Sequence, residues 1–407
     1  MISKMDPKKR WMLTASVFSL ISNAPIGVLV AEQLGPEFYS IISSYLLVVS
    51  AASMLVYFGL ETLLVKILGP LEADKKANVF GAVLLLRTTI FIFLSCGLIF
   101  LSPEVILPFL LGATAFDILF FFQQDYEARD DFVLLAKIRI LLIVVVSSLR
   151  LSFIAADVVN PSYYLMIYNL EKMLFVLFLF IGSPALRKSL SSVRFLFLSD
   201  IEWKALARES TYLLASALLF FVLARTDQGI LYLNGDKVAL ANYAISVRLV
   251  EAIYFVPVIL SNIFMAKISG TELDFEGKRQ LVVRETKTLF FLGLILIPIM
   301  MLVVFILDRS LLRSFDAFYD ISSIYIILLP ALFTYNILKK AMVYLDCSKV
   351  FFQVMALIAV CHISGSLLIY QVFANVIFLA VMTIASFYIT SFILAVIVYG
   401  KMGSMRG

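Results

Sequence analysis

The chain has little charge, few cysteines and one histidine, and each shortage excludes a class of protein. Only 15% of its 407 residues are charged, whereas a soluble domain has about 25%, so a soluble globular fold is excluded. Three cysteines, Cys96, Cys347 and Cys361, give no disulfide framework. The single histidine, His362, excludes a metal site built from several histidines. We expect no metal, no cofactor and no nucleic-acid partner.

Hydrophobic residues, in contrast, make up 62% of the chain, and the mean hydropathy is +1.01. A run of about 20 apolar residues is long enough to cross a bilayer as a helix. The sequence therefore predicts an all-α integral membrane protein with about twelve transmembrane helices. The twelve runs lie at about 11–31, 40–68, 79–101, 105–124, 138–156, 162–182, 210–233, 238–266, 288–307, 321–345, 350–370 and 376–399.

The lysines and arginines orient these spans, because cytoplasmic loops are enriched in both residues. If the N-terminus is cytoplasmic, the outer loops hold only Lys237, Arg309 and Arg313 of the 33. Both termini are therefore predicted to be cytoplasmic. The basic start, MDPKKR, precedes a run that lacks a small-x-small cleavage site, so we interpret this run as an uncleaved first helix.

The longest inner connection divides the helices into six and six. The predicted organisation is an N-terminal six-helix lobe over 1–185, a cytoplasmic interfacial linker over 186–209 and a C-terminal six-helix lobe over 210–407. A short turn, one long span and the pattern K-I-x-G recur over 35–69 and 235–270. Because each half has six spans, the two repeats should have the same topology and be related by a pseudo-two-fold axis along the membrane normal.

Two blocks of the sequence resemble the polysaccharide-export flippases of the Wzx type. The first comprises AEQLGPEFYSIIS and FGLETLLVKILG around the first two spans. The second is LARTDQGILYLNGDKVALANYAISVRLVEAIYFVPVILSNIFMAKIS, in which an aspartate–glutamine pair, a Y-x-x-A-x-R-L-like stretch and a proline follow one another. Its matching residues are Asp227, Gln228, Tyr243, Ser246 (in place of the usual alanine), Arg248, Leu249 and Pro257. The resemblance covers all twelve spans in outline and is specific only in these blocks.

This family belongs to the superfamily of the multidrug exporters and the lipid II flippase. The resemblance implies a flippase that moves an undecaprenyl-pyrophosphate-linked oligosaccharide, an O-antigen or similar repeat unit, from the inner to the outer leaflet of a bacterial plasma membrane. The resemblance also implies alternating access, ion coupling and contact with membrane lipid. It further implies a glycan polymerase and a chain-length regulator as partners. The lipid II flippase usually has fourteen helices, so twelve argue against that member of the superfamily.

Ionisable residues inside the spans are the candidate site, because a charge in the bilayer is costly and is usually functional. Five cations against five anions (Glu251 among them) indicate pairing, which explains several of them structurally. Arginine, however, binds a pyrophosphate with two parallel hydrogen bonds. The candidate pyrophosphate contacts are Arg150, Arg225 and Arg248, followed by Arg87 and Lys172. A carboxylate in low dielectric can exchange a proton with the conformational state, and the ion-coupling candidates are Asp227, Glu61, Asp117 and Glu171.

Within LARTDQ, Arg225 and Asp227 are two residues apart and so point about 200° apart on a helix. We expect no direct contact between them. We expect Asp227 to pair with Arg248 on the adjacent helix, which would leave Arg225 for the ligand in a cavity between the lobes. His362 is either a proton-transferring group or a hydrogen-bonded packing residue.

Two other functions fit the composition. One is a cation-coupled multidrug exporter, which would favour an acidic and aromatic cavity. The other is a polyprenol-linked glycan polymerase, which usually needs a large outer loop, whereas the longest outer loop expected here is 308–320. The sequence has no phosphate-binding glycine loop, metal cluster or nucleophile elbow, and we predict that the protein is not an enzyme.

The topology is testable with reporter fusions. A fusion after Arg208 and another after Arg406 should both report a cytoplasmic location, because each follows a segment that is rich in lysine and arginine. The activity of fused alkaline phosphatase and the fluorescence of fused green fluorescent protein report on which side of the membrane each fusion site lies. A periplasmic signal at either site would overturn the six-plus-six arrangement.

Overall fold

The computed structural model describes residues 7–58, 60, 64, 68, 73–101, 107–128, 131–182, 203–254, 256–258, 260–261, 264, 275–345 and 347–404. Within these ranges the chain is helical and has no β-strand, as the apolar runs predict. The chain divides into two compact units: unit 1 holds residues 1–34 and 41–217, and unit 2 holds 35–40 and 218–407. The expected linker, 186–209, lies outside the described residues up to position 202.

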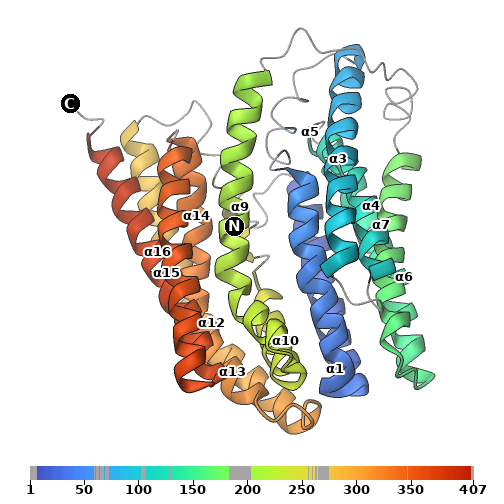
Figure 1. Ribbon diagram of the computed structural model, residues 1–407. Helices are drawn as coiled ribbons and strands as arrows, with labels where there is room; N and C mark the ends of the chain where they lie inside the picture. Colours follow the sequence, from blue (N-terminus) through green and yellow to red (C-terminus); the bar gives the residue numbers. More distant parts are fainter. Residues whose placement is uncertain are drawn as a thin grey trace. The chain divides into compact units, whose positions relative to one another are not determined.

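Unit 1 is built from the first helices of the chain (Figure 1). These are α1 (Pro7–Tyr57), α3 (Ala73–Leu101), α4 (Leu107–Ile118), α5 (Phe121–Ala128), α6 (Phe132–Ala155) and α7 (Pro161–Gly182). Helix α9 (Trp203–Leu233) begins in unit 1 and continues into unit 2.

Unit 2 contains the rest of α9 and the later helices (Figure 1). They are α10 (Lys237–Glu251), α12 (Phe275–Ser310), α13 (Phe318–Tyr325), the 3₁₀ turn η2 (Ile326–Leu328), α14 (Leu329–Tyr344), α15 (Ser348–Phe373) and α16 (Val376–Ser404).

Eleven helices in the described ranges are long and apolar enough to cross a membrane. The first two predicted runs lie together in α1, where Gly35 interrupts the helical backbone with φ 67° and ψ 172°. Glycine adopts such a positive φ without steric cost. With α1 taken as two helices joined at Gly35, the structure agrees with the predicted twelve.

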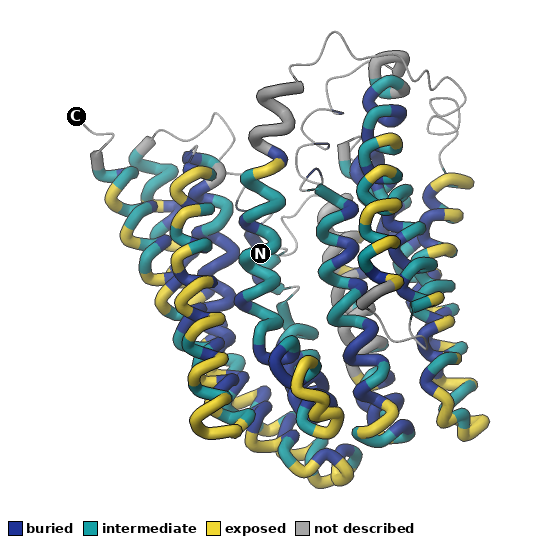
Figure 2. The backbone as a smooth tube through the Cα atoms, viewed as in Figure 1, coloured by how far each residue is buried: buried dark blue, intermediate teal, exposed yellow. Residues whose placement is uncertain are grey.

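The helices expose apolar side chains and bury polar ones, which is the distribution expected for a protein surrounded by lipid. Phe93 on α3, Leu357 on α15 and Phe392 on α16 are 75%, 64% and 70% exposed. The exposed residues recur along single faces of these helices (Figure 2). Conversely, Asp117 and Asp227 are almost completely buried. A buried charge requires a partner, so these aspartates direct the search for a site.

The fourth span is interrupted in both units. In unit 1, α4 ends at Ile118 and α5 begins at Phe121. In unit 2, the 3₁₀ turn Ile326–Leu328 separates α13 from α14. A carbonyl at each break accepts a hydrogen bond from a side chain, as backbone at membrane depth requires. Arg87 Nη1 lies 3.4 Å from the Asp117 carbonyl oxygen, and the Tyr388 hydroxyl lies 2.8 Å from the Ile327 carbonyl oxygen.

Interrupted segments at corresponding positions of two halves are typical of transporter repeats. The two breaks therefore favour the predicted repeat, whose superposition about an axis remains a prediction. Lys66 and Lys267, the lysines of the two K-I-x-G patterns, lie outside the described residues.

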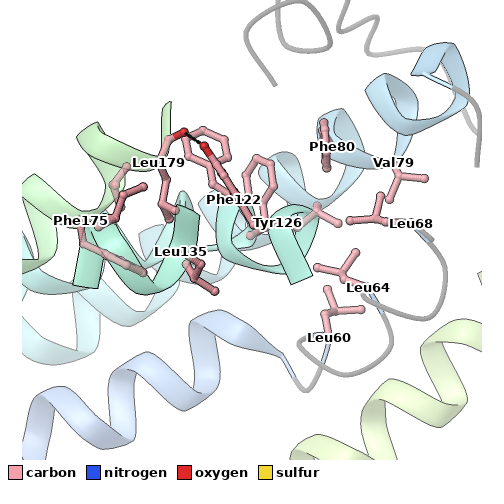
Figure 3. Close-up of a cluster of buried hydrophobic side chains, with 14 of the residues drawn as sticks. Leu60, Leu64, Leu68, Val79, Phe80, Phe122, Tyr126, Leu135, Phe175 and Leu179 are labelled. Carbon is pink, nitrogen blue, oxygen red and sulfur yellow. Dashed lines mark hydrogen bonds between the residues drawn. The ribbon is translucent and has the colours of Figure 1, made fainter. Parts of the chain in front are cut away.

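One end of unit 1 is held by a cluster of buried aromatic and aliphatic side chains (Figure 3). Phe80 of α3 packs against Phe121 of α5 with ring centroids 5.2 Å apart. The Tyr126 hydroxyl donates a 2.8 Å hydrogen bond to the Leu179 carbonyl oxygen on α7. This bond satisfies the polar end of an otherwise apolar ring, as a buried tyrosine requires, and it ties α5 to α7.

Unit 2 is organised around its interrupted span, Phe318–Met342. Of an apolar 18-residue segment of this span, 83% is buried. Helix α12 packs closely against the start of α14. A Cβ added to Gly293 would lie 2.6 Å from the Cα of Pro330. Only a glycine permits this approach of two backbones.

Gly293→Ala should therefore lower the melting temperature of the purified protein. The added methyl group meets backbone atoms that cannot rotate away, and such overpacking costs about 1–3 kcal/mol. Gly400→Ala is the matched control, because no atom lies within 4 Å of its Cβ position. A thermal melt in detergent measures both, and equal melting temperatures would contradict the close packing.

Candidate functional site

Asp117 of α4 lies at the centre of a polar cluster inside unit 1. Both of its carboxylate oxygens are 2.8 Å from Lys172 Nζ on α7. The Tyr57 hydroxyl donates to Oδ1 at 2.8 Å, and the Ser53 hydroxyl donates to Oδ2. Asp117 is fully buried, while the Lys172 side chain is 25% exposed. The carboxylate thus pairs with a lysine and accepts hydrogen bonds from two hydroxyls.

Arg87 of α3 lies beside this cluster and is fully buried. Its guanidinium lies 5.4 Å from the Tyr57 ring centroid and 6.0 Å from that of Phe121, within cation–π range. Its Nη1 donates to the Asp117 carbonyl oxygen at the end of α4. Arg87 therefore stabilises the interrupted span.

A second ion pair of unit 1 joins α6 to α7. Arg150 Nη2 lies 2.9 Å from Glu171 Oε2. The guanidinium also lies over the ring of Tyr168, 4.7 Å from its centroid. Arg150 is 9% exposed at its side chain, and Glu171 is 35% exposed.

Unit 2 holds a similar pair between α9 and α10. Arg225 Nη2 lies 2.7 Å from Glu251 Oε1 and 2.8 Å from Oε2. The two side chains are 21% and 35% exposed. The expectation that Arg225 would have no protein partner is therefore wrong, because Glu251 on the adjacent helix binds it.

Asp227, two residues further along α9, points into the interior of unit 2 and is 1% exposed. Its Oδ2 accepts hydrogen bonds from the hydroxyls of Tyr243 on α10 and Thr383 on α16. Its Oδ1 lies 3.8 Å from His362 Nε2 on α15. The separation of Arg225 and Asp227 onto different faces of α9 is as their spacing predicts.

The expected pairing of Asp227 with Arg248 is wrong, and the geometry of the turn explains why. Helices α9 and α10 run back from Gly235, and Asp227 and Tyr243 lie the same number of residues on either side of it. Antiparallel neighbours therefore place Tyr243 at the depth of Asp227, and Arg248 one turn further on. Arg248 is half-buried near the end of α10.

The predicted site residues thus separate into groups. Unit 1 brings together Asp117, Lys172 and Arg87, with Arg150 and Glu171 as a separate pair; unit 2 holds the pair Arg225–Glu251, the buried Asp227, and Arg248. Glu61 lies outside the described residues. No group of three potential metal ligands occurs in the part of the chain that the structure describes.

Sequence reasoning missed the hydroxyl donors of both aspartate sites. Ser53 and Tyr57 are four residues apart on α1, and Thr383 and Ser386 are three apart on α16, so each pair shares one helix face. That spacing is a weak signal, because a hydroxyl in an apolar helix often bonds its own backbone, as Thr390 does with the Ser386 carbonyl oxygen.

The fold is similar to that of solved transporters of the MOP superfamily. A multidrug-resistance MATE transporter in an inward-facing conformation matches with a TM-score of 0.66 and 13% identity, covering 98% of this chain and 99% of its own. The lipid II flippase MurJ, inward closed, matches with a TM-score of 0.61 and 15% identity, covering 94% and 86%. A MOP-superfamily transporter from Pyrococcus furiosus, described by a binding pocket of reverse polarity, matches with a TM-score of 0.58 and 12% identity, covering 100% and 98%.

No protein-family model matches the sequence, and no curated protein matches it. At these identities the similarity to solved structures establishes the fold. Function must then be argued from the site itself.

The Asp117–Lys172 pair should be important for stability. Lys172→Met removes the cation from a fully buried carboxylate, and breaking a buried pair in this way costs about 3–5 kcal/mol. We expect a large fall in melting temperature and in membrane abundance. The double variant Asp117→Asn/Lys172→Met should recover much of the loss, because no charge is then left unpaired.

Arg284→Met serves as the control for this experiment. Arg284 pairs with Glu285 on α12 but is 67% exposed at its side chain, and exposed pairs contribute about 0–1 kcal/mol. If Lys172→Met melts at the temperature of Arg284→Met, the Asp117 pair is not a structural requirement.

Proposed function

We propose that the protein is a flippase for an undecaprenyl-pyrophosphate-linked oligosaccharide, an O-antigen or similar repeat unit. It moves this lipid from the inner to the outer leaflet of a bacterial plasma membrane by ion-coupled alternating access, with both termini in the cytoplasm. A glycan polymerase and a chain-length regulator would act on the product. The fold supports a transporter, and the lipid II flippase is a solved example of this fold with a lipid-linked substrate.

The pair Arg225–Glu251 carries the proposal. Glu251 engages a single nitrogen of Arg225, Nη2, through both carboxylate oxygens. In the ranges that the structure describes, Arg225 has no other hydrogen bond, and its side chain is 21% exposed. The guanidinium carries five N–H donors, so the remaining donors can bind a phosphate while Glu251 keeps the arginine in place.

Arg150 provides the corresponding group in unit 1, since its partner Glu171 is likewise the more exposed member of the pair. A pyrophosphate carries negative charge on both of its phosphates, so more than one cation favours it. Arg248 is a further candidate contact. Arg87, which is fully buried, and Lys172, which is held by Asp117, are placed after these in the proposal.

One observation favours a multidrug exporter of cationic compounds as the second candidate. Glu171 and Glu251 are each 35% exposed and thus more accessible than their arginines. An accessible carboxylate attracts a cation rather than a phosphate. The same fold serves multidrug-resistance MATE transporters, so the two candidates must be separated by experiment.

The variant Arg225→Met/Glu251→Met separates them, because it removes both charges and leaves neither unpaired. Loss of a charge-assisted hydrogen bond costs about 1.5–3 kcal/mol, so binding of undecaprenyl pyrophosphate should weaken roughly tenfold or more. Arg225→Lys should retain part of the binding. Native mass spectrometry of the purified protein with undecaprenyl pyrophosphate, and separately with ethidium, measures this.

The control is Arg284→Met/Glu285→Met, which removes another arginine–glutamate pair from unit 2 and should leave both ligands unaffected. Unchanged binding of undecaprenyl pyrophosphate by the Arg225→Met/Glu251→Met variant would overturn the proposed role of Arg225. Loss of ethidium binding alone would favour the multidrug exporter.

A further inference from the structure

Asp227 and His362 face one another inside unit 2, and each presents an atom that has no other partner. Asp227 Oδ1 and His362 Nε2 are 3.8 Å apart, and both side chains are at most 1% exposed. Neither atom makes a hydrogen bond within the described structure. The opposite ends of both groups are bonded: Oδ2 accepts from Tyr243 and Thr383, and His362 Nδ1 lies 3.0 Å from Ser386 Oγ.

We propose that Asp227 and His362 together form a proton-binding site, and that this site couples proton movement to the conformation of unit 2. The coupling role rests on the proposed transport function, whereas the proton site itself does not. The ligand is a proton, which adds to His362 Nε2 and is then shared with Asp227 Oδ1.

A proton fits the gap because of the chemistry of the two facing atoms. A carboxylate oxygen offers only lone pairs, and an imidazole nitrogen offers either a lone pair or an N–H. When the neutral ring carries its proton on Nδ1, the lone pair of Nε2 faces a carboxylate lone pair in a dry interior, and neither group is satisfied. With a proton on Nε2, the same atoms attract, and the negative charge of Asp227 gains a counter-charge.

The buried aspartate of unit 1 provides a comparison within the same chain. Asp117 and Asp227 both accept from one tyrosine and one smaller hydroxyl side chain. Asp117 also has the amino group of Lys172, which lies 2.8 Å from its carboxylate. In the same position Asp227 has a histidine, whose imidazole can be either neutral or protonated. The site in unit 1 is therefore fixed, and the site in unit 2 responds to protons.

The other groups around the pair do not replace this proton. Tyr243 of α10 donates to Asp227, and Tyr325 of α13 packs edge-on against Tyr243 with ring centroids 6.0 Å apart. A tyrosine hydroxyl is a neutral hydrogen-bonding group and supplies no positive charge to Asp227. The nearest charged residues, Arg225 of α9 and Glu251 of α10, are bound to each other. Helix α16 contributes the hydroxyls of Thr383 and Ser386 and the Met382 backbone, which hydrogen-bonds to His362.

The site connects four helices, and this gives the proton a mechanical effect. Asp227 lies on α9, Tyr243 on α10, His362 on α15 and Thr383 on α16. When His362 Nε2 carries the proton, α15 is attracted to α9 at this point; without that proton, the two helices repel each other there. Binding and release of one proton therefore change the packing of α15 within unit 2, which is the kind of two-state element that coupled transport requires.

The single histidine of the chain makes the proton site directly measurable. Protein labelled with ¹⁵N in the histidine ring gives the signals of His362 alone. In the full chain in nanodiscs, both ring nitrogens should change together in one pH titration. Asp227→Asn should move the titration midpoint by about one pH unit or more, which corresponds to about 1.4 kcal/mol of interaction. Glu285→Gln, a carboxylate of the same unit that pairs with Arg284 on α12, should leave it unchanged.

Tyr243→Phe provides a second test if Asp227→Asn fails to fold. It removes one hydroxyl donor from Asp227 and should also move the midpoint. A midpoint that is the same in wild type and in these variants would overturn the site. So would a His362 signal that does not titrate, or one that saturates with sodium at constant pH, which would identify a sodium site instead.

Transport in proteoliposomes tests the coupling separately. An imposed pH gradient should accelerate flipping of undecaprenyl-pyrophosphate-linked disaccharide by the wild type but not by His362→Gln, which keeps a polar side chain but cannot titrate. Flipping that responds to the gradient equally in both proteins would overturn the coupling role. If the histidine titrates as expected while no lipid-linked sugar is flipped, the proton site stands and the proposed substrate is wrong.

Discussion

The constraint that shapes this protein is the cost of placing a charge where no water can solvate it. Four acidic residues inside the spans meet that cost in different ways. Asp117 has Lys172, while Glu171 and Glu251 have arginines. Asp227 has two hydroxyls and a histidine. Each charge takes its partner from a neighbouring helix. These polar contacts join helices α1, α4, α6 and α7 within unit 1, and helices α9, α10, α15 and α16 within unit 2.

This constraint also separates structural charges from those available for function. A pair whose carboxylate is completely buried costs stability if it is opened, so Asp117 holds α4 and α7 together. A pair whose carboxylate is 35% exposed can exchange its partner at lower cost, because water replaces the lost contact. Arg225 and Arg150, each held by a glutamate that is 35% exposed, belong to the second kind. This difference is the physical basis for placing a phosphate ligand at these arginines.

The interruptions of the fourth spans follow the same logic at the level of the backbone. Breaking a helix in an apolar environment frees carbonyl groups, and those groups need donors. Arg87 supplies one at Asp117, and Tyr388 supplies one at Ile327. In unit 1 the break directly follows the buried aspartate, so the charged site and the irregular backbone form one structural feature. In unit 2 the break lies in the most buried span, around which the other helices pack.

The sequence alone determined that the protein is an all-α membrane protein. Hydropathy depends on composition over about 20 residues, so the spans were predictable from local information, and the two helices that meet at Gly35 were predicted as separate runs. The 100° turn per residue likewise determined that Arg225 and Asp227 lie on different faces of α9. Only the tertiary structure decided the partners. Asp227 was expected to meet Arg248 and instead meets Tyr243, Thr383 and His362. Their identity depends on how α10, α15 and α16 pack against α9, and that packing is set by contacts between residues as far apart in the chain as 156 positions.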